Sequence, residues 1–466
     1  MSTDNPVRSR ADVRRVALSS YLGTTIEYYD FLLYGTAAAL VFNKVFFSNL
    51  SPAIGTLVAL ATLAAGYLAR FVGAMIFGHF GDRTGRKKVM LTTMVIMGLS
   101  SGFIGLLPTY DQIGGAAPLL LVSLRLVQGI AVGGEYGGAV LMVSEHASTK
   151  RRGLASSAAA MGGPSGQLLA TGAMLWVASL PEDQMLSWGW RVPFLVSFVL
   201  LAVGMYFRVR VHESPVFLDS QAATASPPKG TPIAALLRSE PATLFKAVLF
   251  QIGPYCGMGI FGIFIISYAP TIGHSRSTAL TGVLVGTFLS VVMTPAYAAL
   301  SDRIGRRPVV LGGIIATATV AFPIFYLVNL GSSPILVTTI ALYIGLVMTS
   351  VTGVAPVMLT EMFPTKWRYT GVSTTYQLAQ TVGSGFSPLI ATSLLTAAGG
   401  ATNTWPVGLF LVLTAAASIW AVLTLPDRSH QELDQIGPGI AGGLAAPSPR
   451  TGDTVHLSDQ TMFDPH

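Results

Sequence analysis

The stretch GDRTGRKKVM, residues 81–90, decides the fold because it returns as SDRIGRRPVV at residues 301–310. A second pair, SEHASTKRR at 144–152 and TEMFPTKWR at 360–368, recurs at an offset of 216 residues, against 220 for the first pair. One match between basic loops could arise by chance, whereas two at nearly equal offsets indicate an internal duplication. The sequence therefore predicts two related halves.

Composition predicts that both halves lie in a membrane. Hydrophobic residues make up 51% of the 466 positions and charged residues 11%, whereas about a quarter of an average soluble domain is charged. A hydrocarbon core about 30 Å thick is crossed by about 20 apolar residues in a helix. We expect an all-α membrane protein with twelve transmembrane helices in two six-helix, pseudo-symmetric bundles. The expected spans are 16–42, 54–78, 88–107, 118–145, 153–179, 190–209, 244–271, 279–300, 308–328, 334–359, 368–397 and 404–425.

A polar, proline-containing segment after the sixth span divides the chain into its two bundles. The tail after the twelfth span is rich in Gly, Pro and Ala and is expected to be disordered. The expected organisation is a cytoplasmic N-terminal arm at 1–15, the N-terminal bundle at 16–209, a cytoplasmic central loop at 210–243, the C-terminal bundle at 244–426 and a disordered cytoplasmic tail at 427–466.

The net charge of +7 comes largely from basic residues in alternate short loops. This asymmetry is the positive-inside pattern of cell-membrane (plasma or inner membrane) proteins, and it predicts that both termini are cytoplasmic. A membrane explanation of the charge is sufficient, so we expect no nucleic-acid partner. The chain lacks the H-E-x-x-H, G-x-S-x-G and Walker A motifs, and we therefore expect no enzyme activity, no catalytic residue, no metal site and no direct use of ATP.

Several motifs resemble one transporter family. The loop GHFGDRTGRKK (78–88), with its echo in the second half, resembles the signature of the major facilitator superfamily. The set GTTIEYYDFLLYG, LARFVGAMIFGHFGDRTGRK, RLVQGIAVGGEYGGA, SWGWRVPF, HESPVF and FPTKWRYTG resembles its metabolite:proton symporter family, particularly the shikimate-transporter-like members. The resemblance runs from the first span to the eleventh.

Five charged residues lie inside the predicted spans, all in the first half: Glu27, Asp30, Arg70, Arg125 and Glu135. A lone charge at the bilayer centre costs at least about 2.5–3.5 kcal/mol, so such residues usually pair or line a wet cavity. Two nearby acids in a low dielectric do not both ionise readily, and one is then suited to carry a proton. The alternative is a structural network of ion pairs without transport chemistry.

The resemblance implies roles for some of these residues. Asp30 and Arg125 match an acid on the first helix that faces an arginine on the fourth; protonation of Asp30 would then release the guanidinium to bind a substrate carboxylate. Glu27 is left open between sharing the proton, pairing with Arg70 and contacting substrate. Arg70 is either that partner or a second anion contact, and Glu135 either acts in coupling and gating or is a hydrogen-bonded packing acid.

Uncharged polar residues complete the predicted substrate site. They suit the hydroxyl and carbonyl groups of a ligand, although hydrogen bonding between helices is the commoner use of such residues. The predicted substrate contacts, besides Arg125 and Arg70, are Tyr34, Gln128, Gln251, Tyr255, Tyr376 and Gln380.

The repeated loops predict a cytoplasmic gate, because topology alone does not explain why the acidic residues recur with the basic ones. The gating motif is expected to comprise Gly78, Asp82, Arg83, Gly85, Arg86, Glu145, Arg152, Asp302, Arg303, Arg306, Glu361 and Arg368. In addition, glycines at every fourth position of the fourth span, Gly129, Gly133 and Gly137, predict close helix packing.

The leading hypothesis is a proton-coupled symporter that imports a small organic anion, such as a mono- or dicarboxylate or a shikimate-like hydroxy acid, by alternating access. The alternatives are transport of a zwitterionic osmolyte or amino acid of the proline or betaine kind, uniport, and a receptor that keeps the fold without transport. We expect no cofactor beyond the proton gradient, partners limited to the substrate, protons and the lipid bilayer, and a monomer.

Overall fold

The computed structural model describes residues 10–84, 86–133, 140, 141, 143, 144, 151–209, 232–364, 368–400, 403–428 and 431. For some of the predicted residues, either the whole residue or its side chain is not described by the structure. These residues are Gly78, Asp82, Arg83, Gly85, Arg86, Glu135, Gly137 and Glu145. Throughout the described part of the chain the regular secondary structure is helical, as the composition predicts.

Each predicted span of the first half coincides with a helical segment, although 134–139 and parts of 142–150 are not described. The elements are α1 (Arg10–Ala37), η1 (Ala38–Phe42), α2 (Asn43–Val45), α3 (Pro52–Thr84), α4 (Arg86–Leu106), α5 (Tyr110–Ile113), α6 (Ala116–Val132), α8 (Arg152–Ser179), α9 (Glu182–Gln184), η3 (Met185–Gly189) and α10 (Arg191–Val209). Helix α1 begins within the predicted N-terminal arm.

The second half repeats this pattern after α12 (Pro232–Ser239), a short helix within the predicted central loop. Its elements are α13 (Pro241–Gly259), η4 (Ile260–Phe264), α14 (Ile265–Tyr268), η5 (Ala269–Ile272), α15 (Arg276–Ile304), α16 (Arg306–Val328), α17 (Ser333–Leu342), η6 (Tyr343–Met348), α18 (Thr349–Thr352), α19 (Ala355–Thr360), α20 (Arg368–Gln380), η7 (Thr381–Gly385), α21 (Ser387–Ala397) and α22 (Trp405–Thr424).

The duplication is visible in local structure as well as in sequence. A π-helical turn interrupts the first span at Ala38–Phe42, and another interrupts the seventh at Ile260–Phe264, 222 residues later. Such turns free backbone groups from the regular helical ladder and often occur at functional sites. The two interruptions therefore lie at equivalent places in the two halves.

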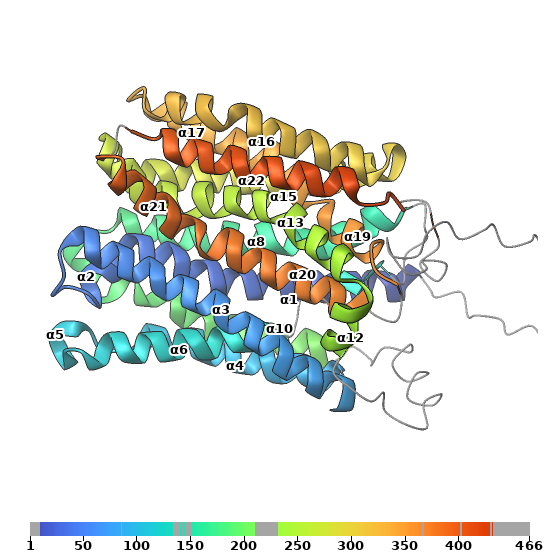
Figure 1. The fold of residues 1–466 in the computed structure, drawn as a ribbon. Helices are drawn as coiled ribbons and strands as arrows, with labels where there is room; N and C mark the ends of the chain where they lie inside the picture. Colours follow the sequence, from blue (N-terminus) through green and yellow to red (C-terminus); the bar gives the residue numbers. More distant parts are fainter. Residues whose placement is uncertain are drawn as a thin grey trace, which may run out of the picture.

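The long helices run side by side along the molecule, with α1, α8, α13 and α20 between the outer layers (Figure 1). Helix α1 packs on α8, α8 packs on α15 of the other half, and α3 contacts α20 and η7. The interface between the halves is thus built from the first, second, fifth, eighth and eleventh spans. We call the two ends of the bundle the α19 end and the α2 end, after the elements labelled there (Figure 1).

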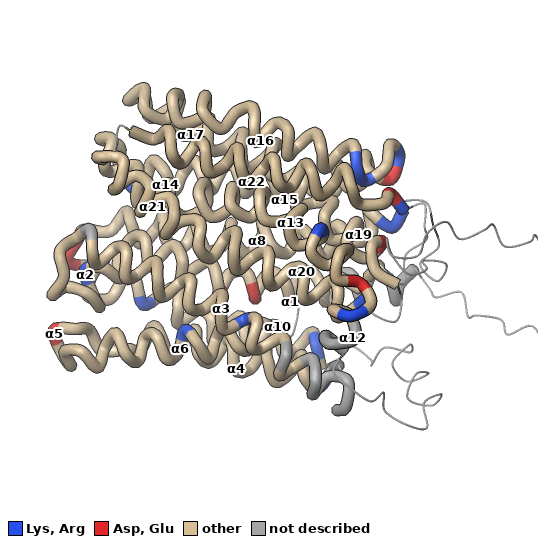
Figure 2. Tube along the Cα trace, viewed as in Figure 1, with Lys and Arg blue, Asp and Glu red and all other residues tan. Residues whose placement is uncertain are grey.

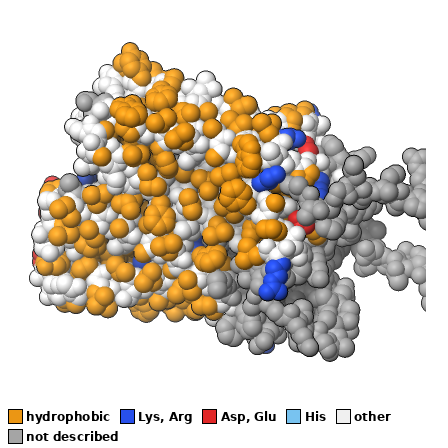
Figure 3. All heavy atoms as spheres, viewed as in Figure 1, with side chains coloured by type: hydrophobic (Ala, Val, Ile, Leu, Met, Phe, Trp, Pro, Cys, Tyr) orange, Lys and Arg blue, Asp and Glu red, His pale blue; other side chains and the backbone are white. Residues whose placement is uncertain are grey.

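Charged residues gather at these two ends, and few lie at mid-length (Figure 2). Hydrophobic side chains cover the visible flank of the helices between the ends (Figure 3). Eight helical segments of the described chain are long and apolar enough to cross a membrane. Helices α1, α8 and α20 are not among them, because these helices carry many polar side chains of the interface between the halves.

Glycines allow α6 to lie against α3, as the spacing of Gly129 and Gly133 predicts. A Cβ added to Gly129 would lie 2.3 Å from the carbonyl oxygen of Gly66, and one added to Gly133 would lie 2.1 Å from that of Arg70. These distances are far below van der Waals contact, so the two backbones touch directly. The close crossing fixes where α3 presents Arg70.

Candidate functional site

Asp30 lies on α1 and is fully buried. Ser197 of α10 donates a hydrogen bond to its Oδ1 atom, and Gln128 of α6 donates to its backbone oxygen at 3.3 Å. Burial of a carboxyl group favours its protonated form, and a hydrogen-bond donor partly offsets that preference. The structure therefore places a fully buried, hydrogen-bonded carboxyl on the first span.

Arg125 of α6 does not form an ion pair with Asp30 in the described structure. Its Nη1 atom instead donates to Gln128 Oε1, and the Gln128 amide nitrogen donates to the backbone oxygen of Asp30 and to the hydroxyl of Ser101. The guanidinium stacks over the rings of Phe31 and Tyr34, with Cζ 3.7 Å and 4.2 Å from their centroids. The direct contact between guanidinium and carboxyl that the resemblance implies is therefore not present in this structure, and Gln128 links Arg125 to the backbone of Asp30.

The remaining donors of Arg125 make the guanidinium suited to an anion. Its Nε and Nη2 atoms are buried and have no hydrogen-bond partner. Gly66 of α3 makes room for it, since a Cβ at Gly66 would lie 2.3 Å from Arg125 Nε. Buried polar groups are rarely left without partners, because each costs roughly 1–3 kcal/mol, more for a charged group. An acceptor that reached this position would be bound strongly.

Arg70 of α3 provides a second buried guanidinium, and it reaches across to the other half. Its Nη1 atom donates to Gln380 Oε1 of α20 at 3.2 Å, while its Nε atom has no hydrogen-bond partner. Its Cζ atom lies 3.5 Å from the centroid of Phe31. Among the described contacts of the two arginines, the hydrogen bond of Arg70 crosses the interface, whereas that of Arg125 stays within the first half.

Gln380 also gathers hydroxyl groups from both halves. Its amide nitrogen donates to Tyr28 Oη at 3.0 Å and to Tyr376 Oη at 2.7 Å, and the two tyrosine hydroxyls hydrogen-bond to each other. The Tyr255 ring lies edge-on to Tyr376, with the centroids 5.9 Å apart. A guanidinium and a hydroxyl cluster therefore meet at one amide.

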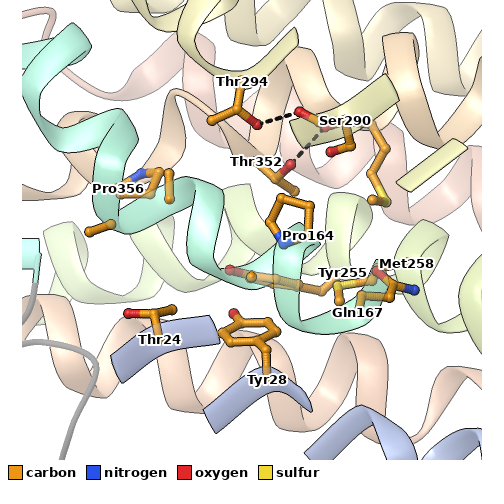
Figure 4. Close-up of a pocket in the computed structure, with 14 residues that line it drawn as sticks. Thr24, Tyr28, Pro164, Gln167, Tyr255, Met258, Ser290, Thr294, Thr352 and Pro356 are labelled. Carbon is orange, nitrogen blue, oxygen red and sulfur yellow. Dashed lines mark hydrogen bonds between the residues drawn. The ribbon is translucent and has the colours of Figure 1, made fainter. Parts of the chain in front are cut away.

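A small cavity of about 50 Å³ lies beside this cluster, between the halves. Tyr28, Gln167 and Tyr255 extend toward it, with Thr352 and Met258 near them (Figure 4). Its first-half lining comes from α1 and α8, and its second-half lining comes from α13, α15, η6, α18 and α19. This is the position at which a ligand would contact both halves.

The other predicted substrate contacts are placed as follows. Gln251 is buried on α13 and does not line this cavity. Tyr34 hydrogen-bonds Thr62 at 2.7 Å, and Gln128 is bonded within the first half to Arg125, Ser101 and the Asp30 backbone. Glu27 is fully buried on α1, and Glu135 lies outside the described residues.

At the α19 end a buried ion cluster joins the halves. Glu361 accepts hydrogen bonds from Arg152 of the first half at 3.1 Å and from Nε and Nη2 of Arg306, both at 3.3 Å. Burial raises the pKa of the Glu361 carboxyl above its ordinary value, even though the two guanidinium groups act in the opposite direction. The cluster thus connects α8 with α16 and the end of α19.

Asp302 adds a second connection by capping a helix of the other half. Its two carboxylate oxygens accept hydrogen bonds from the backbone nitrogens of Gly153 and Leu154, both at 2.9 Å. These amides belong to the first turn of α8, where backbone donors lack partners within the helix and negative charge is favoured. Arg306 also donates to Asp302 at 2.6 Å.

Two other predicted gate residues, Arg368 and Arg303, differ in their surroundings. Arg368 donates from Nε to the backbone oxygens of Thr360 and Phe363, which terminates α19. Arg303 is exposed. Arg152 also donates to the backbone oxygen of Gln431 at 3.3 Å, so a residue from the predicted tail contacts the cluster. The side chains of the other first-half gate residues, Asp82, Arg83, Arg86 and Glu145, lie outside the described residues.

The halves also meet at the α2 end. Arg276, at the start of α15, donates to the backbone oxygen of Leu40 at 3.0 Å. Leu40 lies in the π-helical turn of the first span. Lys44 and Glu182 form an exposed ion pair at the same end. The structure therefore has contacts between its halves at both ends and at the centre.

Some residues of the site were not predicted from sequence. Phe31 and Tyr67 are apolar or aromatic residues within hydrophobic runs, and nothing in their spacing distinguishes them from packing residues. Tyr28 and Gln167 line the cavity. Tyr28 directly follows Glu27 in the sequence. Its position beside an acid inside a predicted span is the one sequence feature that could have identified it as a site residue.

The family comparison agrees with the fold. A model described as Major Facilitator Superfamily matches residues 20–373 and again 255–439. The proton:xylose symporter XylE, bound to 6-bromo-6-deoxy-D-glucose, has a similar structure, with a TM-score of 0.72, 19% identity and coverage of 92% of this chain and 98% of that one. At this identity the likeness concerns the fold.

Curated relatives are more similar in sequence. The shikimate transporter of Escherichia coli K12 is 39% identical over 430 residues, covering 92% of this chain and 98% of the relative. The inner membrane metabolite transport protein YhjE of the same organism is 38% identical, with coverage of 92% and 97%. The proline/betaine transporter of that organism is 30% identical, with coverage of 92% and 86%.

Proposed function

The chain belongs to the major facilitator superfamily, a family of membrane transporters and not of enzymes, and on that premise we propose that it is a proton-coupled symporter of a small organic anion. The observation that carries the proposal is the pair of buried guanidiniums, Arg70 and Arg125, whose Nε atoms have no hydrogen-bond partner. Arg70 reaches the hydroxyl cluster at the interface of the halves through Gln380, and Arg125 is linked through Gln128 to the backbone of Asp30. A carboxylate suits such a guanidinium because it accepts two parallel hydrogen bonds.

The proposed coupling is a change of partner by Arg125, from Gln128 to the Asp30 carboxyl. When Asp30 is ionised, its charge attracts the Arg125 guanidinium, which leaves Gln128 and pairs with the carboxylate. When Asp30 carries a proton, that attraction is lost and Arg125 is available to the substrate carboxylate. Proton binding and substrate binding then favour each other, which is the thermodynamic requirement for symport.

Alternating access would use the contacts at the two ends in turn. The Arg152–Glu361 pair and the Asp302 cap close the α19 end, and the Arg276 hydrogen bond closes the α2 end. We propose that the α19 end faces the cytoplasm, with both termini, because the predicted basic loops lie there. Such a transporter acts as a monomer, and the proton gradient replaces any cofactor.

Proteoliposomes test this function directly. An inward proton gradient should drive accumulation of at least one acid from a panel of shikimate, quinate, lactate, citrate and 2-oxoglutarate. Asp30→Asn should abolish accumulation and retain equilibrium exchange, whereas the exposed Asp183→Asn should behave as wild type. Accumulation by Asp30→Asn equal to wild type would refute Asp30 as the proton carrier.

A zwitterion remains the second candidate because a proline/betaine transporter is among the relatives. Proline and glycine betaine therefore belong in the same panel. Uptake of these two without uptake of any acid would select this alternative. Uptake that follows the substrate gradient alone, with no response to the proton gradient, would identify a uniporter.

A further inference from the structure

Phe31 occupies an unusual position between two positive charges. The Cζ atoms of Arg70 and Arg125 lie 3.5 Å and 3.7 Å from the centroid of its ring. Two guanidiniums this near one centroid cannot share a face without overlapping, so they stack on opposite faces. Tyr67 holds the ring at its edge, with the centroids 4.6 Å apart and the planes 77° from parallel.

Each guanidinium belongs to a different part of the proposed mechanism. Arg125 is linked through Gln128 to the backbone oxygen of Asp30, the proposed proton carrier. Arg70 leads to Gln380 and its hydroxyl cluster, which is the inter-half side near the cavity. The two arginines both contact the ring of Phe31, which follows Asp30 in α1.

We infer that Phe31 is a positioning residue that makes substrate binding at Arg70 depend on the position of Arg125; this inference rests on the proposed function. If Arg125 moves to an ionised Asp30, one face of Phe31 loses its cation. The ring and the Arg70 guanidinium on its other face then repack, and the geometry offered to a substrate carboxylate changes. With Asp30 protonated, both faces are occupied and Arg70 is held in place.

The response of this stack to pH involves more groups than Asp30 alone. The titratable or charged groups that interact with the stacked arginines and their neighbours are Glu27, Tyr28 and Tyr34 on α1, Tyr67 on α3, Tyr255 on α13 and Tyr376 on α20. The deciding readout is therefore the ratio of accumulation to exchange at one fixed pair of pH values, and not a pH profile.

The test compares two buried phenylalanines of the first span. Phe31→Leu removes both π faces and keeps an apolar side chain, so the arginines lose their common contact. Phe42→Leu is the matched control, because Phe42 is fully buried in an aromatic cluster with Tyr34, Phe46, Trp190 and Phe194 and has no described guanidinium over its ring. Phe31→Met serves as a second variant if the leucine protein does not fold.

Gradient-driven accumulation and equilibrium exchange are measured with the panel acid that wild type accumulates most, starting with shikimate. We expect Phe31→Leu to lower the accumulation ratio by about tenfold, within the usual range of coupling between two sites, while its exchange rate changes far less and Phe42→Leu keeps the wild-type ratio.

An unchanged ratio in Phe31→Leu overturns the inference, and so does a parallel loss of exchange and accumulation, which is the signature of packing alone. Absence of gradient-driven uptake by wild type with every acid overturns the proposed function instead.

Discussion

The ion cluster at the α19 end gives the most direct test of the gate. Glu361→Gln keeps the shape of the side chain and removes its charge. The variant leaves the Asp302 cap on α8 intact, because those two hydrogen bonds come from Gly153 and Leu154. It changes one contact that crosses the interface, the 3.1 Å pair with Arg152.

The magnitude follows from that one contact. A hydrogen bond to a charged group contributes about 1.5–3 kcal/mol and a neutral one about 0.5–1.5 kcal/mol. The glutamine amide oxygen still accepts from Arg152, so the closed α19 end loses about 1–2 kcal/mol relative to the open one. A difference of one to two kcal/mol changes an equilibrium by a factor of about 5–30.

Labelling of a cysteine in the central cavity measures this shift. Ala160 lines the cavity, and Cys256, the one native cysteine, is buried. In a Cys256→Ala background, Ala160→Cys should react with a maleimide only when the α19 end opens. When opening and closing are fast compared with labelling, the rate follows the open population, as it does for proteolysis. Glu361→Gln should therefore raise the rate by about 5–30-fold.

If Glu361→Gln labels within twofold of the rate of the Cys256→Ala, Ala160→Cys background, the reasoning is refuted. The matched control Arg238→Gln should leave that labelling rate unchanged. Arg238 is exposed on α12 and tests whether any change of charge at this end is sufficient. The double variant Arg152→Gln with Glu361→Gln completes the cycle. Because the two residues share one interaction, its effect should be smaller than the sum of the single effects.

A further prediction concerns packing. Gly129→Ala should lower thermal stability by about 1–3 kcal/mol, the usual cost of overpacking, because its Cβ would meet the Gly66 backbone. Gly172→Ala is the control and should keep wild-type stability, since its Cβ would have its nearest neighbour at 3.6 Å. Equal melting temperatures of the two variants would contradict the close-packing argument.

The sequence determined the architecture because the membrane imposes strong periodic constraints on it. Backbone groups in hydrocarbon must be satisfied within helices, so each long apolar run predicts a span, and the duplicated loops predict two bundles. The buried charges of α1, α3 and α6 were also identifiable, since a charged residue inside such a run is rare without a function. The predicted gate residues Asp302, Arg306 and Glu361 were selected because their loops recur in the two halves.

The tertiary structure decided which of these residues meet. Sequence spacing fixes neighbours along one helix, whereas Gln128 between Asp30 and Arg125, Gln380 beside Arg70, and Asp302 on the first turn of α8 are contacts between helices. Such contacts depend on crossing angles and on close approaches like that of Gly129 to Gly66. Phe31 is the clearest case: in sequence it is one more apolar residue, and only the packing of three helices places it between two cations.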